Sequence, residues 1–327
     1  MNRKDQHLQF AYEQQPKTNA FDNMQLTHQA FPETALSEID LSVNLFSQTF
    51  PLPFYINAMT GGSDQAKAIN QRLAMLAKHF AMPIATGSLT TAIKDPSLLP
   101  TFQVMRETYP EGFIFANIGV GQILERAQQA INIIQANALQ IHVNPVQEAV
   151  MPEGDKDFRG WLSFIKQVQK EINIPLIVKE VGFGMSELSL QQLVNIGVQY
   201  VDVAGQGGTN FAVIENQRRS KPFMSFNHWG ISTVQSLLNA KKFSNLTTIA
   251  SGGIRSPLDV VKSLVLGAKM VGLSGFFLHL VKDHTHEEAV AEIQHWIDEL
   301  KLIMLVLGKQ NILALPTVPY TWTHAPQ

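Results

Sequence analysis

The sequence has no cysteine among its 327 residues. Disulfide bridges, thiolate nucleophiles and thiolate metal sites are therefore excluded. The charged N-terminal residues include no apolar segment of the kind found in secretory signals. Since both absences fit a reducing compartment, we expect a cytoplasmic location.

Long hydrophobic runs and a large net charge are also missing. Runs such as Leu300–Gly308 contain a lysine and fall well short of the roughly 20 residues that a membrane-spanning helix needs. The formal net charge of −2 argues against a broad nucleic-acid or anionic-membrane surface, although it allows a local basic pocket. Apolar residues make up 45% of the chain, which is enough to fill a large core. We expect a soluble protein with no nucleic-acid or membrane partner.

Short apolar segments recur along the chain, and segments with helical periodicity lie between them. Eight such units predict a closed parallel (β/α)8 TIM barrel, and an open doubly wound sheet is the alternative. The expected strands are Pro53–Met59, Pro83–Gly87, Phe113–Ile118, Ala138–Val143, Leu176–Val181, Tyr200–Ala204, Thr247–Ala250 and Met270–Leu273. The expected helices include Gln65–Phe80, Val120–Asn137, Trp161–Ile172, Ser189–Ile196, Ser232–Ala240 and Pro257–Leu266.

Residues 1–50 do not follow this repeat. They are rich in Gln, Asn and Thr and show weak periodicity, so we expect an N-terminal extension in which Asp40–Phe46 has the pattern of a short strand. On residue type alone, Arg3, Lys4 and His7 are interpreted as a solvated basic tail.

The other end of the chain has a clear helix signal. Thr285 and Glu288 form a capping-box pattern, which predicts a final helix running to about Leu307. Since no low-complexity linker interrupts the sequence, we expect residues 1–327 to form a single domain.

The stretch Ala138–Glu148 starts as an apolar strand and then presents His142, Asn144, Gln147 and Glu148 within seven residues. Active sites of TIM barrels lie at the carboxyl ends of the strands. A single carboxylate suits magnesium that keeps its waters and takes its other ligands from substrate phosphates. Glu148 is therefore a candidate magnesium ligand, and capping of the next helix or pairing with a cation is the structural alternative.

Glycine-containing pairs follow the last two expected strands, as Gly252-Gly253 and Ser274-Gly275. Loops at these two positions of a TIM barrel often bind phosphate, because glycine lets backbone N–H groups approach the anion. Two such pairs favour a phosphate site over simple turns.

Lys179 interrupts an apolar strand, and a buried lysine is costly unless it is paired or bound to a ligand. Adjacent residues of a strand face opposite sides, so only one of Lys179 and Glu180 points into the barrel mouth. We assign Lys179 inward, beside an electron-rich cofactor. A Schiff-base lysine is the competing functional interpretation.

These residues together resemble the type 2, FMN-dependent isopentenyl-diphosphate delta-isomerase family over nearly the whole chain. A Gly-Gly-Thr match alone is weak, but the His-x-Asn-x-x-Gln-Glu run at 142–148 with Arg-Lys-x-x-His at 3–7 is specific. Further matches are Phe21-Asp22, His28, Phe31-Pro32-Glu33, Asp40-Leu41-Ser42, Ala58-Met59-Thr60-Gly61-Gly62, Gly87-Ser88, Asn117, Lys179-Glu180-Val181-Gly182, Gly207-Gly208-Thr209, Trp229-Gly230-Ile231, Ser251-Gly252-Gly253-Ile254-Arg255 and Ser274-Gly275.

The resemblance implies FMN, Mg2+ and NADPH as reductant, a homo-oligomer (tetramer or octamer), and interconversion of isopentenyl and dimethylallyl diphosphate. Arg3, Lys4 and His7 would bind the diphosphate rather than form a solvated tail. His142, Asn144 and Gln147 would line the substrate, and Glu148 would hold magnesium. The implied flavin contacts are Ala58, Met59, Thr60, Ser88, Asn117, Lys179 and Thr209, with Gly252, Gly253, Ile254, Ser274 and Gly275 at its phosphate.

For the chemistry we expect an allylic proton shift with no net redox change. The sequence shows no tuned carboxylate pair, so reduced flavin is expected to act as acid and base. We assign catalytic roles to Gln147, which would position the reacting carbons or relay a proton, to Lys179, which would stabilise negative charge on the reduced ring, and to His142 beside them.

Two positions depart from the family pattern. Ala204 stands where serine is usual, which removes one flavin hydrogen bond, and Ser232 replaces a proline at a helix start. Two other functions stay open: an FMN-dependent oxidoreductase of the same barrel type, such as a 2-hydroxy-acid oxidase or dihydroorotate dehydrogenase, and a non-catalytic flavin-binding barrel.

Overall fold

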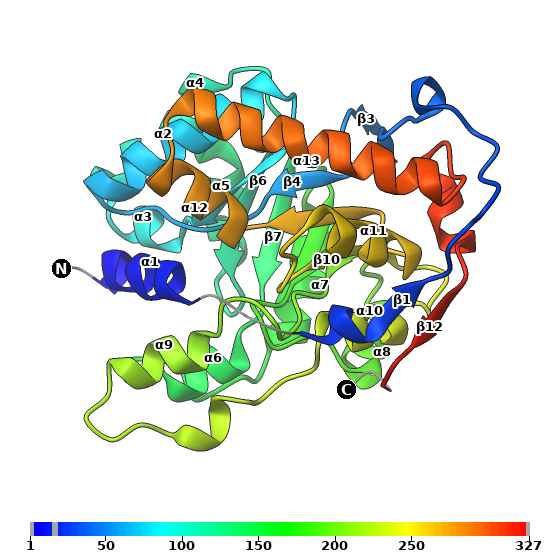
Figure 1. Ribbon diagram of the computed structural model, residues 1–327. Helices are drawn as coiled ribbons and strands as arrows, with labels where there is room; N and C mark the ends of the chain where they lie inside the picture. Colours follow the sequence, from blue (N-terminus) through cyan, green and yellow to red (C-terminus); the bar gives the residue numbers. More distant parts are fainter. Residues whose placement is uncertain (1–2, 15–18, 325–327) are drawn as a thin grey trace.

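The computed structural model describes residues 3–14 and 19–324, and its centre is a closed barrel of eight parallel strands (Figure 1). The strands follow chain order around the barrel, and the last pairs with the first. The TIM barrel is therefore confirmed and the open doubly wound sheet is wrong. The strands are β4 (Phe54–Ile56), β5 (Ile84–Ser88), β6 (Ile114–Gly119), β7 (Ala138–His142), β8 (Leu176–Lys179), β9 (Tyr200–Asp202), β10 (Thr247–Ser251) and β11 (Met270–Leu273).

Several strands end earlier than their apolar patterns indicated, because the chain turns into the loops of the barrel mouth. After β4, for example, Asn57 Oδ1 accepts a hydrogen bond from the backbone N–H of Ala58 at 2.8 Å, and Pro53–Met59 is not one continuous strand. The polar residues of these loops thus leave the sheet and become available to the mouth.

Helices surround the barrel, and several begin with a serine that accepts a backbone hydrogen bond. Ser63, for example, accepts from Ala66 N at 3.1 Å. The helices are α2 (Asp64–His79), α3 (Thr90–Lys94), α4 (Pro100–Thr108), α5 (Leu124–Ile133), α6 (Pro145–Val150), α7 (Trp161–Glu171), α8 (Glu187–Asn195), α9 (Phe211–Gln217), α10 (Thr233–Ala240), α11 (Pro257–Val265), α12 (Gly275–Asp283) and α13 (His286–Val306).

The capping box before α13 is present as expected: Glu288 N donates to Thr285 Oγ1 and Thr285 N donates to Glu288 Oε2. Ser232, the second departure from the family pattern, caps α10 by accepting from Gln235 N at 3.1 Å. Short 3-10 helices complete the inventory at η1 (Ala20–Asn23), η2 (Leu36–Glu38), η3 (Pro96–Leu98), η4 (Met224–Phe226) and η5 (Ile312–Thr317).

A hairpin from the N-terminal region fills the amino end of the barrel. It consists of β2 (Val43–Leu45) and β3 (Gln48–Phe50), so the expected strand over Asp40–Phe46 is shorter and has a partner that the sequence pattern did not indicate. Phe46 and Phe50 pack against Phe113, with ring centroids 5.6 and 5.2 Å apart. The hairpin therefore covers the amino end of the barrel.

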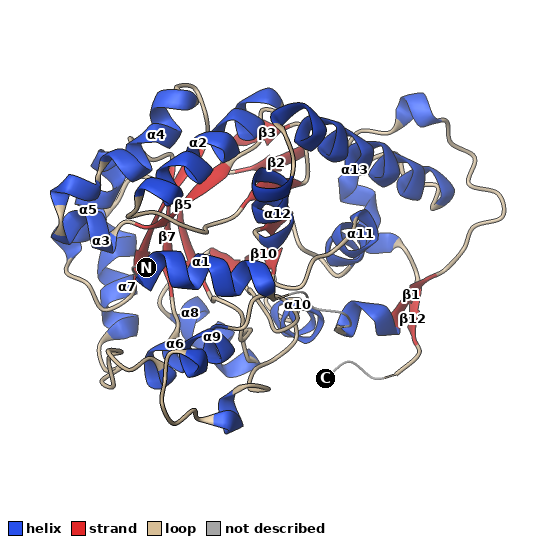
Figure 2. Cartoon of the chain, turned by 60° about the vertical axis from the view of Figure 1, so that its left-hand side comes forward, coloured by secondary structure: helices blue, strands red, loops and turns tan. Residues whose placement is uncertain are grey.

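The first helix, α1 (Arg3–Glu13), contacts α12 and α9 and lies in front of the strand ends (Figure 2). Leu8 is only 5% exposed, so α1 is packed and is not the solvated tail that residue types indicated. Further along, β1 (Met24–Leu26) pairs antiparallel with β12 (Tyr320–Trp322) near the other end of the chain. Over the described residues, no helix has both the length and the apolar character needed to cross a bilayer.

Candidate active site

All residues expected to contact the flavin lie at or just beyond the carboxyl ends of barrel strands. This placement follows from the fold, because parallel strands point the same ends toward one mouth. The positions are Ala58, Met59 and Thr60 after β4, Ser88 at the end of β5, Asn117 in β6, Lys179 at the end of β8, Thr209 before α9, Gly252, Gly253 and Ile254 after β10, and Ser274 and Gly275 at the start of α12.

The glycines after β9 and β10 let two loops approach closely. A Cβ on Gly208 would lie 2.6 Å from Gly253 N, and Gly253 has φ +72°. At the neighbouring start of α12, a Cβ on Gly275 would meet nothing within 4 Å, and Ser274 makes no side-chain cap. The first turn of this nine-residue helix therefore has no side-chain cap and has room beside Gly275, which fits a phosphate group.

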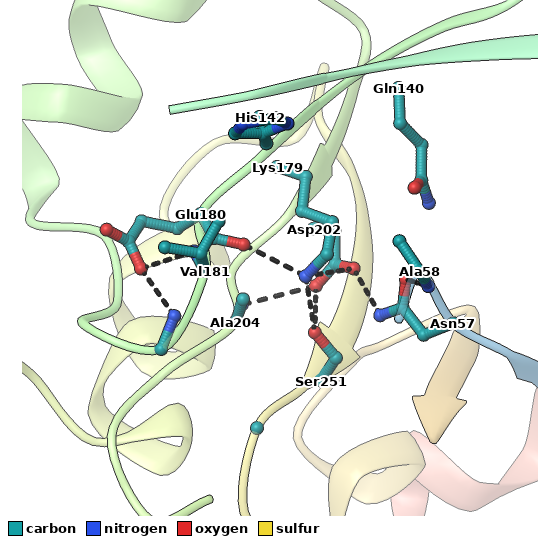
Figure 3. A network of polar contacts seen from close by, with 12 residues as sticks. Asn57, Ala58, Gln140, His142, Lys179, Glu180, Val181, Asp202, Ala204 and Ser251 are labelled. Carbon is teal, nitrogen blue, oxygen red and sulfur yellow. Dashed lines mark hydrogen bonds and ion pairs between the residues drawn. The ribbon is translucent and has the colours of Figure 1, made fainter. Parts of the chain in front are cut away.

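Lys179 points into the barrel beneath this mouth. Its Nζ donates to Glu180 O at 2.9 Å and Ser251 Oγ at 3.2 Å, and lies 3.3 Å from Asp202 Oδ2 (Figure 3). Lys179 is 7% exposed and Asp202 0%, so the pair is buried and each charge compensates the other. A Schiff-base lysine needs an amine that is free to reach the substrate, whereas the Lys179 Nζ is held by three oxygen atoms of the protein.

Glu180 faces away from the Lys179 ammonium, as strand alternation predicted. Its Oε2 accepts from the backbone N–H groups of Val181, Gly182 and Phe183 at 2.6–2.8 Å. Burial raises the pKa of Glu180 to about 7, although these hydrogen bonds oppose the shift. The side chain fixes the loop after β8 and so supports the position of Lys179.

His142 lies next to Lys179, because the two residues are registered partners on β7 and β8. Its Nδ1 lies 2.8 Å from Asn117 Oδ1. Burial, together with the positive charges of Lys4 and Lys179, lowers the pKa of His142 to about 3. His142 is therefore neutral at physiological pH.

Gln147 and Glu148 lie on α6, directly after β7. Asn144 Nδ2 donates to Gln147 Oε1 at 3.2 Å and to Glu148 Oε1 at 3.1 Å. Glu148 Oε2 accepts from the backbone N–H of Asp155 at 2.8 Å. Each carboxylate oxygen thus keeps a free lone pair, which fits a magnesium ion bound by one protein carboxylate. No cluster of three or more His, Asp or Glu residues within 3–14 and 19–324 forms a metal cage.

The α1 helix brings the N-terminal motif to the same mouth. His7 Nε2 lies 3.0 Å from Glu215 Oε1, and Gln147 Nε2 donates to that oxygen at 3.2 Å. The charge of Lys4 acts on the pKa of His142. The backbone of Arg3 begins α1, but its side chain lies outside the described part of the chain.

Several residues of this site were not identified from the sequence. Glu215 and Asp202 are both 0% exposed and organise the two halves of the mouth. Burial raises the pKa of Glu215, but hydrogen bonds from His7, Gln147 and Arg218 outweigh it and the net shift is downward. The one available signal was an acidic residue within an apolar segment, as in Tyr-Val-Asp-Val-Ala at 200–204, which is the same feature that identified Lys179.

A family model describing FMN-dependent dehydrogenases matches residues 116–318 of the chain. The isopentenyl-diphosphate delta-isomerase of Latilactobacillus sakei is 47% identical over 97% of this chain and 92% of its own length. The chain belongs to the isopentenyl-diphosphate delta-isomerase family. Its match to the flavin family places it among the FMN-dependent members.

Two further isopentenyl-diphosphate delta-isomerases extend this relationship. The protein of Staphylococcus epidermidis is 44% identical, covering 95% of this chain and 90% of its own. That of Streptococcus mutans is 43% identical, covering 98% and 96%. The shared length includes the N-terminal region as well as the barrel.

Solved structures of other flavoproteins share the fold of this isomerase family member. A mutant flavocytochrome b2 with pyruvate bound superposes with a TM-score of 0.68 at 17% identity, covering 98% of this chain and 80% of that one. A mandelate oxidase variant with 2-hydroxy-phenylacetamide gives 0.64 at 14% identity, with coverage of 99% and 92%. At these identities the likeness concerns the fold alone.

Proposed function

We propose that this chain interconverts isopentenyl and dimethylallyl diphosphate by an allylic proton shift, with reduced FMN bound at the barrel mouth. One observation carries the proposal. Lys179, on the flavin side, is the registered neighbour of His142, from which the polar run to Glu148 continues directly. A flavin-binding half and a diphosphate-binding half therefore meet in one mouth.

The flavin half consists of Ala58, Met59, Thr60, Ser88, Asn117, Lys179 and Thr209, with the phosphate on Gly252, Gly253, Ile254, Ser274 and Gly275. When bound, reduced FMN supplies the acid and base for the proton shift. Lys179 stabilises negative charge next to the ring from a buried position, where an ammonium interacts more strongly than in water. The Ala204 methyl group offers no hydrogen bond to the flavin.

The diphosphate half consists of Arg3, Lys4, His7, His142, Asn144 and Gln147, with Mg2+ on Glu148. Magnesium and the basic residues hold the charged end of the substrate, and this remote binding energy orients the hydrocarbon end. Since α1 is packed across the strand ends, it also keeps water from the reacting carbons.

Gln147 is the protein group that we place against the reacting carbons. Its amide is fixed at both ends, because Nε2 donates to Glu215 and Oε1 accepts from Asn144. A fixed amide holds the alkene in one orientation or relays a proton at that point, and a neutral His142 beside it adds no competing charge.

Two parts of the proposal concern partners of the chain. NADPH is the reductant that prepares the flavin, and the chain assembles into a homo-oligomer (tetramer or octamer). The single-domain organisation and the cytoplasmic location stay predictions of the sequence.

The test is anaerobic incubation of the purified protein with FMN, NADPH, Mg2+ and isopentenyl diphosphate, followed by product analysis. We expect dimethylallyl diphosphate, with NADPH consumed only once per flavin. NADPH consumption in step with product would instead identify an oxidoreductase, and tight FMN binding without product would identify a binding protein. Wild-type turnover in both FMN-loaded Gln147→Ala and Lys179→Ala variants would refute the assigned roles.

A further inference from the structure

A continuous chain of hydrogen bonds crosses the barrel from Asp202 to His142. Tyr55 OH donates to Asp202 Oδ2, Gln140 Nε2 donates to Tyr55 OH, and Asn117 Nδ2 donates to Gln140 Oε1, each at 3.2 Å. The last link joins Asn117 Oδ1 to His142 Nδ1 at 2.8 Å. Figure 3 shows three of these residues, Gln140, His142 and Asp202, facing the same interior.

The hydrogen bonds of this series can have only one donor-to-acceptor direction, because Asp202, at its start, is an acceptor. Asp202 receives further hydrogen bonds from Asn57 Nδ2, Ser251 Oγ and Ala204 N, and lies against the Lys179 ammonium. Since all of these groups donate to it, the Asp202 carboxylate is the acceptor at this end of the series. Burial and the Asp202 charge raise the pKa of Tyr55 well above its usual range, so the phenol keeps its proton and donates.

Each following group is then oriented by the one before it. The Tyr55 oxygen accepts, so Gln140 presents its NH2 group to Tyr55 and its carbonyl oxygen to Asn117. Asn117 therefore uses its NH2 group on Gln140 and presents its own oxygen to His142. An amide oxygen only accepts, and so His142 Nδ1 must carry the hydrogen.

We infer that Asp202 is a positioning residue whose carboxylate, acting through Tyr55, Gln140 and Asn117, holds His142 as the Nδ1–H tautomer with Nε2 unprotonated toward the mouth. Nε2 has no hydrogen-bond partner among the described residues. Gly119 lies beside it, where a Cβ would approach Nε2 to 3.2 Å, so the absence of a side chain leaves that nitrogen accessible.

The inference deepens the proposed function, on which its consequence for the substrate rests. A neutral imidazole whose exposed nitrogen is an acceptor cannot donate to a diphosphate oxygen. His142 Nε2 can only accept a hydrogen bond from a donor brought to the mouth, and Lys4, whose charge acts on His142, carries an ammonium group of that kind. Charge neutralisation of the diphosphate then falls to the basic residues of α1 and the metal.

The tautomer can be read by NMR of the FMN-loaded protein with 15N-labelled histidine, since an unprotonated ring nitrogen resonates far downfield of a protonated one. Ten histidines contribute signals, and comparison with His142→Gln identifies the pair that belongs to His142. In the wild-type protein we expect an unprotonated Nε2 and a protonated Nδ1. A wild-type His142 with the hydrogen on Nε2 would overturn the inference.

Two variants each remove one hydrogen bond of this series without changing His142. In Tyr55→Phe, Gln140 loses the hydroxyl that orients its amide, and in Gln140→Met, Asn117 loses its acceptor. We expect each to lose the single-tautomer signature and to gain a signal from an unprotonated Nδ1. A single unchanged tautomer in either variant that folds, as judged by flavin loading and thermal unfolding, would count against relay from Asp202.

Thr86→Val is the matched control, because Thr86 Oγ1 accepts from the backbone N–H of Asn117 at 3.2 Å but is not part of the chain. It removes a buried hydroxyl next to Asn117 and should leave the tautomer of His142 as in the wild type. Turnover of isopentenyl diphosphate is measured on the same wild-type sample. An Nδ1–H tautomer without turnover would refute the proposed function alone, and turnover with an Nε2–H tautomer would refute the inference alone.

Discussion

The floor and the rim of the barrel mouth are built in different ways. At the floor, partners of Asp202 such as Tyr55, Lys179 and Ser251 belong to the barrel strands themselves and are fully or nearly buried. At the rim, Glu215 joins side chains from separate helices, with His7 on α1 and Gln147 on α6. The floor is therefore fixed by the barrel strands, whereas the rim depends on side-chain contacts between separate helices.

The opposite edge of the rim follows the same pattern. Tyr12 OH donates to Asp283 Oδ1 at 2.5 Å, and Ser63 Oγ donates to Asp5 Oδ1 at 2.6 Å, so α1 is also attached to α12 and to the start of α2. These contacts are exposed or partly buried, and exposed polar pairs contribute little individually. Changes at the floor should thus damage catalysis and stability together, while changes at the rim should mainly affect substrate or metal binding.

The largest effect is expected from Lys179→Met at the floor. The variant removes a buried cation and leaves the Asp202 charge uncompensated, which should cost about 3–5 kcal/mol of unfolding free energy. Loss of the charge beside the proposed flavin site should lower kcat by roughly 10²–10³-fold. Urea unfolding and turnover at full flavin loading measure the two effects.

Lys262→Met is the control for burial of a lysine. Lys262 is also 7% exposed, and its Nζ donates to Phe21 O at 2.7 Å, away from the mouth. It should lose stability but keep a kcat near that of the wild type. An equal loss of kcat in both variants would mean that the Lys179 effect is only structural.

A smaller effect, confined to metal binding, is expected from Glu148→Gln at the rim. Glutamine retains one oxygen acceptor but loses the charge, so the Mg2+ concentration for half-maximal activity should rise at least roughly tenfold. Magnesium titration of initial rates measures this shift. Asp157→Asn, an equal charge change at an exposed position in the following loop, should leave the titration unchanged; an unaltered requirement in Glu148→Gln would remove Glu148 as the ligand.

His142 lies where floor and rim meet, and it makes stability depend on pH. The unfolded chain protonates this histidine near pH 6.5, whereas the folded protein does so only near pH 3. Between these values the folded state binds fewer protons, so its stability falls as the pH falls below 6.5. Between pH 7.5 and 5 the wild type should lose about 2 kcal/mol more than His142→Gln.

Denaturant unfolding at the two pH values measures this difference. The exposed histidine variant His295→Gln should retain the full loss seen in the wild type. If the free energy of unfolding depended on pH equally in His142→Gln and in the wild type, His142 would take up a proton in the folded protein as readily as in the unfolded chain. His142 would then not belong to the buried floor of the mouth.

The smallest effect is expected from Tyr12→Phe at the rim. Loss of the Tyr12–Asp283 hydrogen bond loosens α1, so the KM for isopentenyl diphosphate should rise roughly two- to fivefold while kcat stays unchanged. Steady-state kinetics separate the two constants. Tyr320→Phe, on β12 and remote from α1, is the matched control, and a fall in kcat without a change in KM would show that α1 is not merely a binding element.

The alternation of strand-like and helix-like segments in the sequence was sufficient to predict the barrel and the strand ends at which the proposed flavin contacts lie. Strand and helix periodicity are local properties, and each segment reveals them without its neighbours. The packed α1 helix was not evident, because its residues Arg3–Glu13 are mostly polar and its burial comes from α9 and α12. The short helices α6 and α9 were also missed, since each is too short to show a period.

The sequence by itself determined the order of strands and helices, the mouth at which polar residues gather, and Lys179 as a charge that needs a partner. Only the tertiary structure decided that this partner is Asp202 and that Glu215 joins His7 to Gln147. It also decided that a series of hydrogen bonds connects Asp202 to His142. The residues of each contact are remote in sequence, as with Tyr55 and Asp202, which are 147 positions apart. Closure of the barrel brings such residues together, and no local pattern encodes which side chains will meet across it.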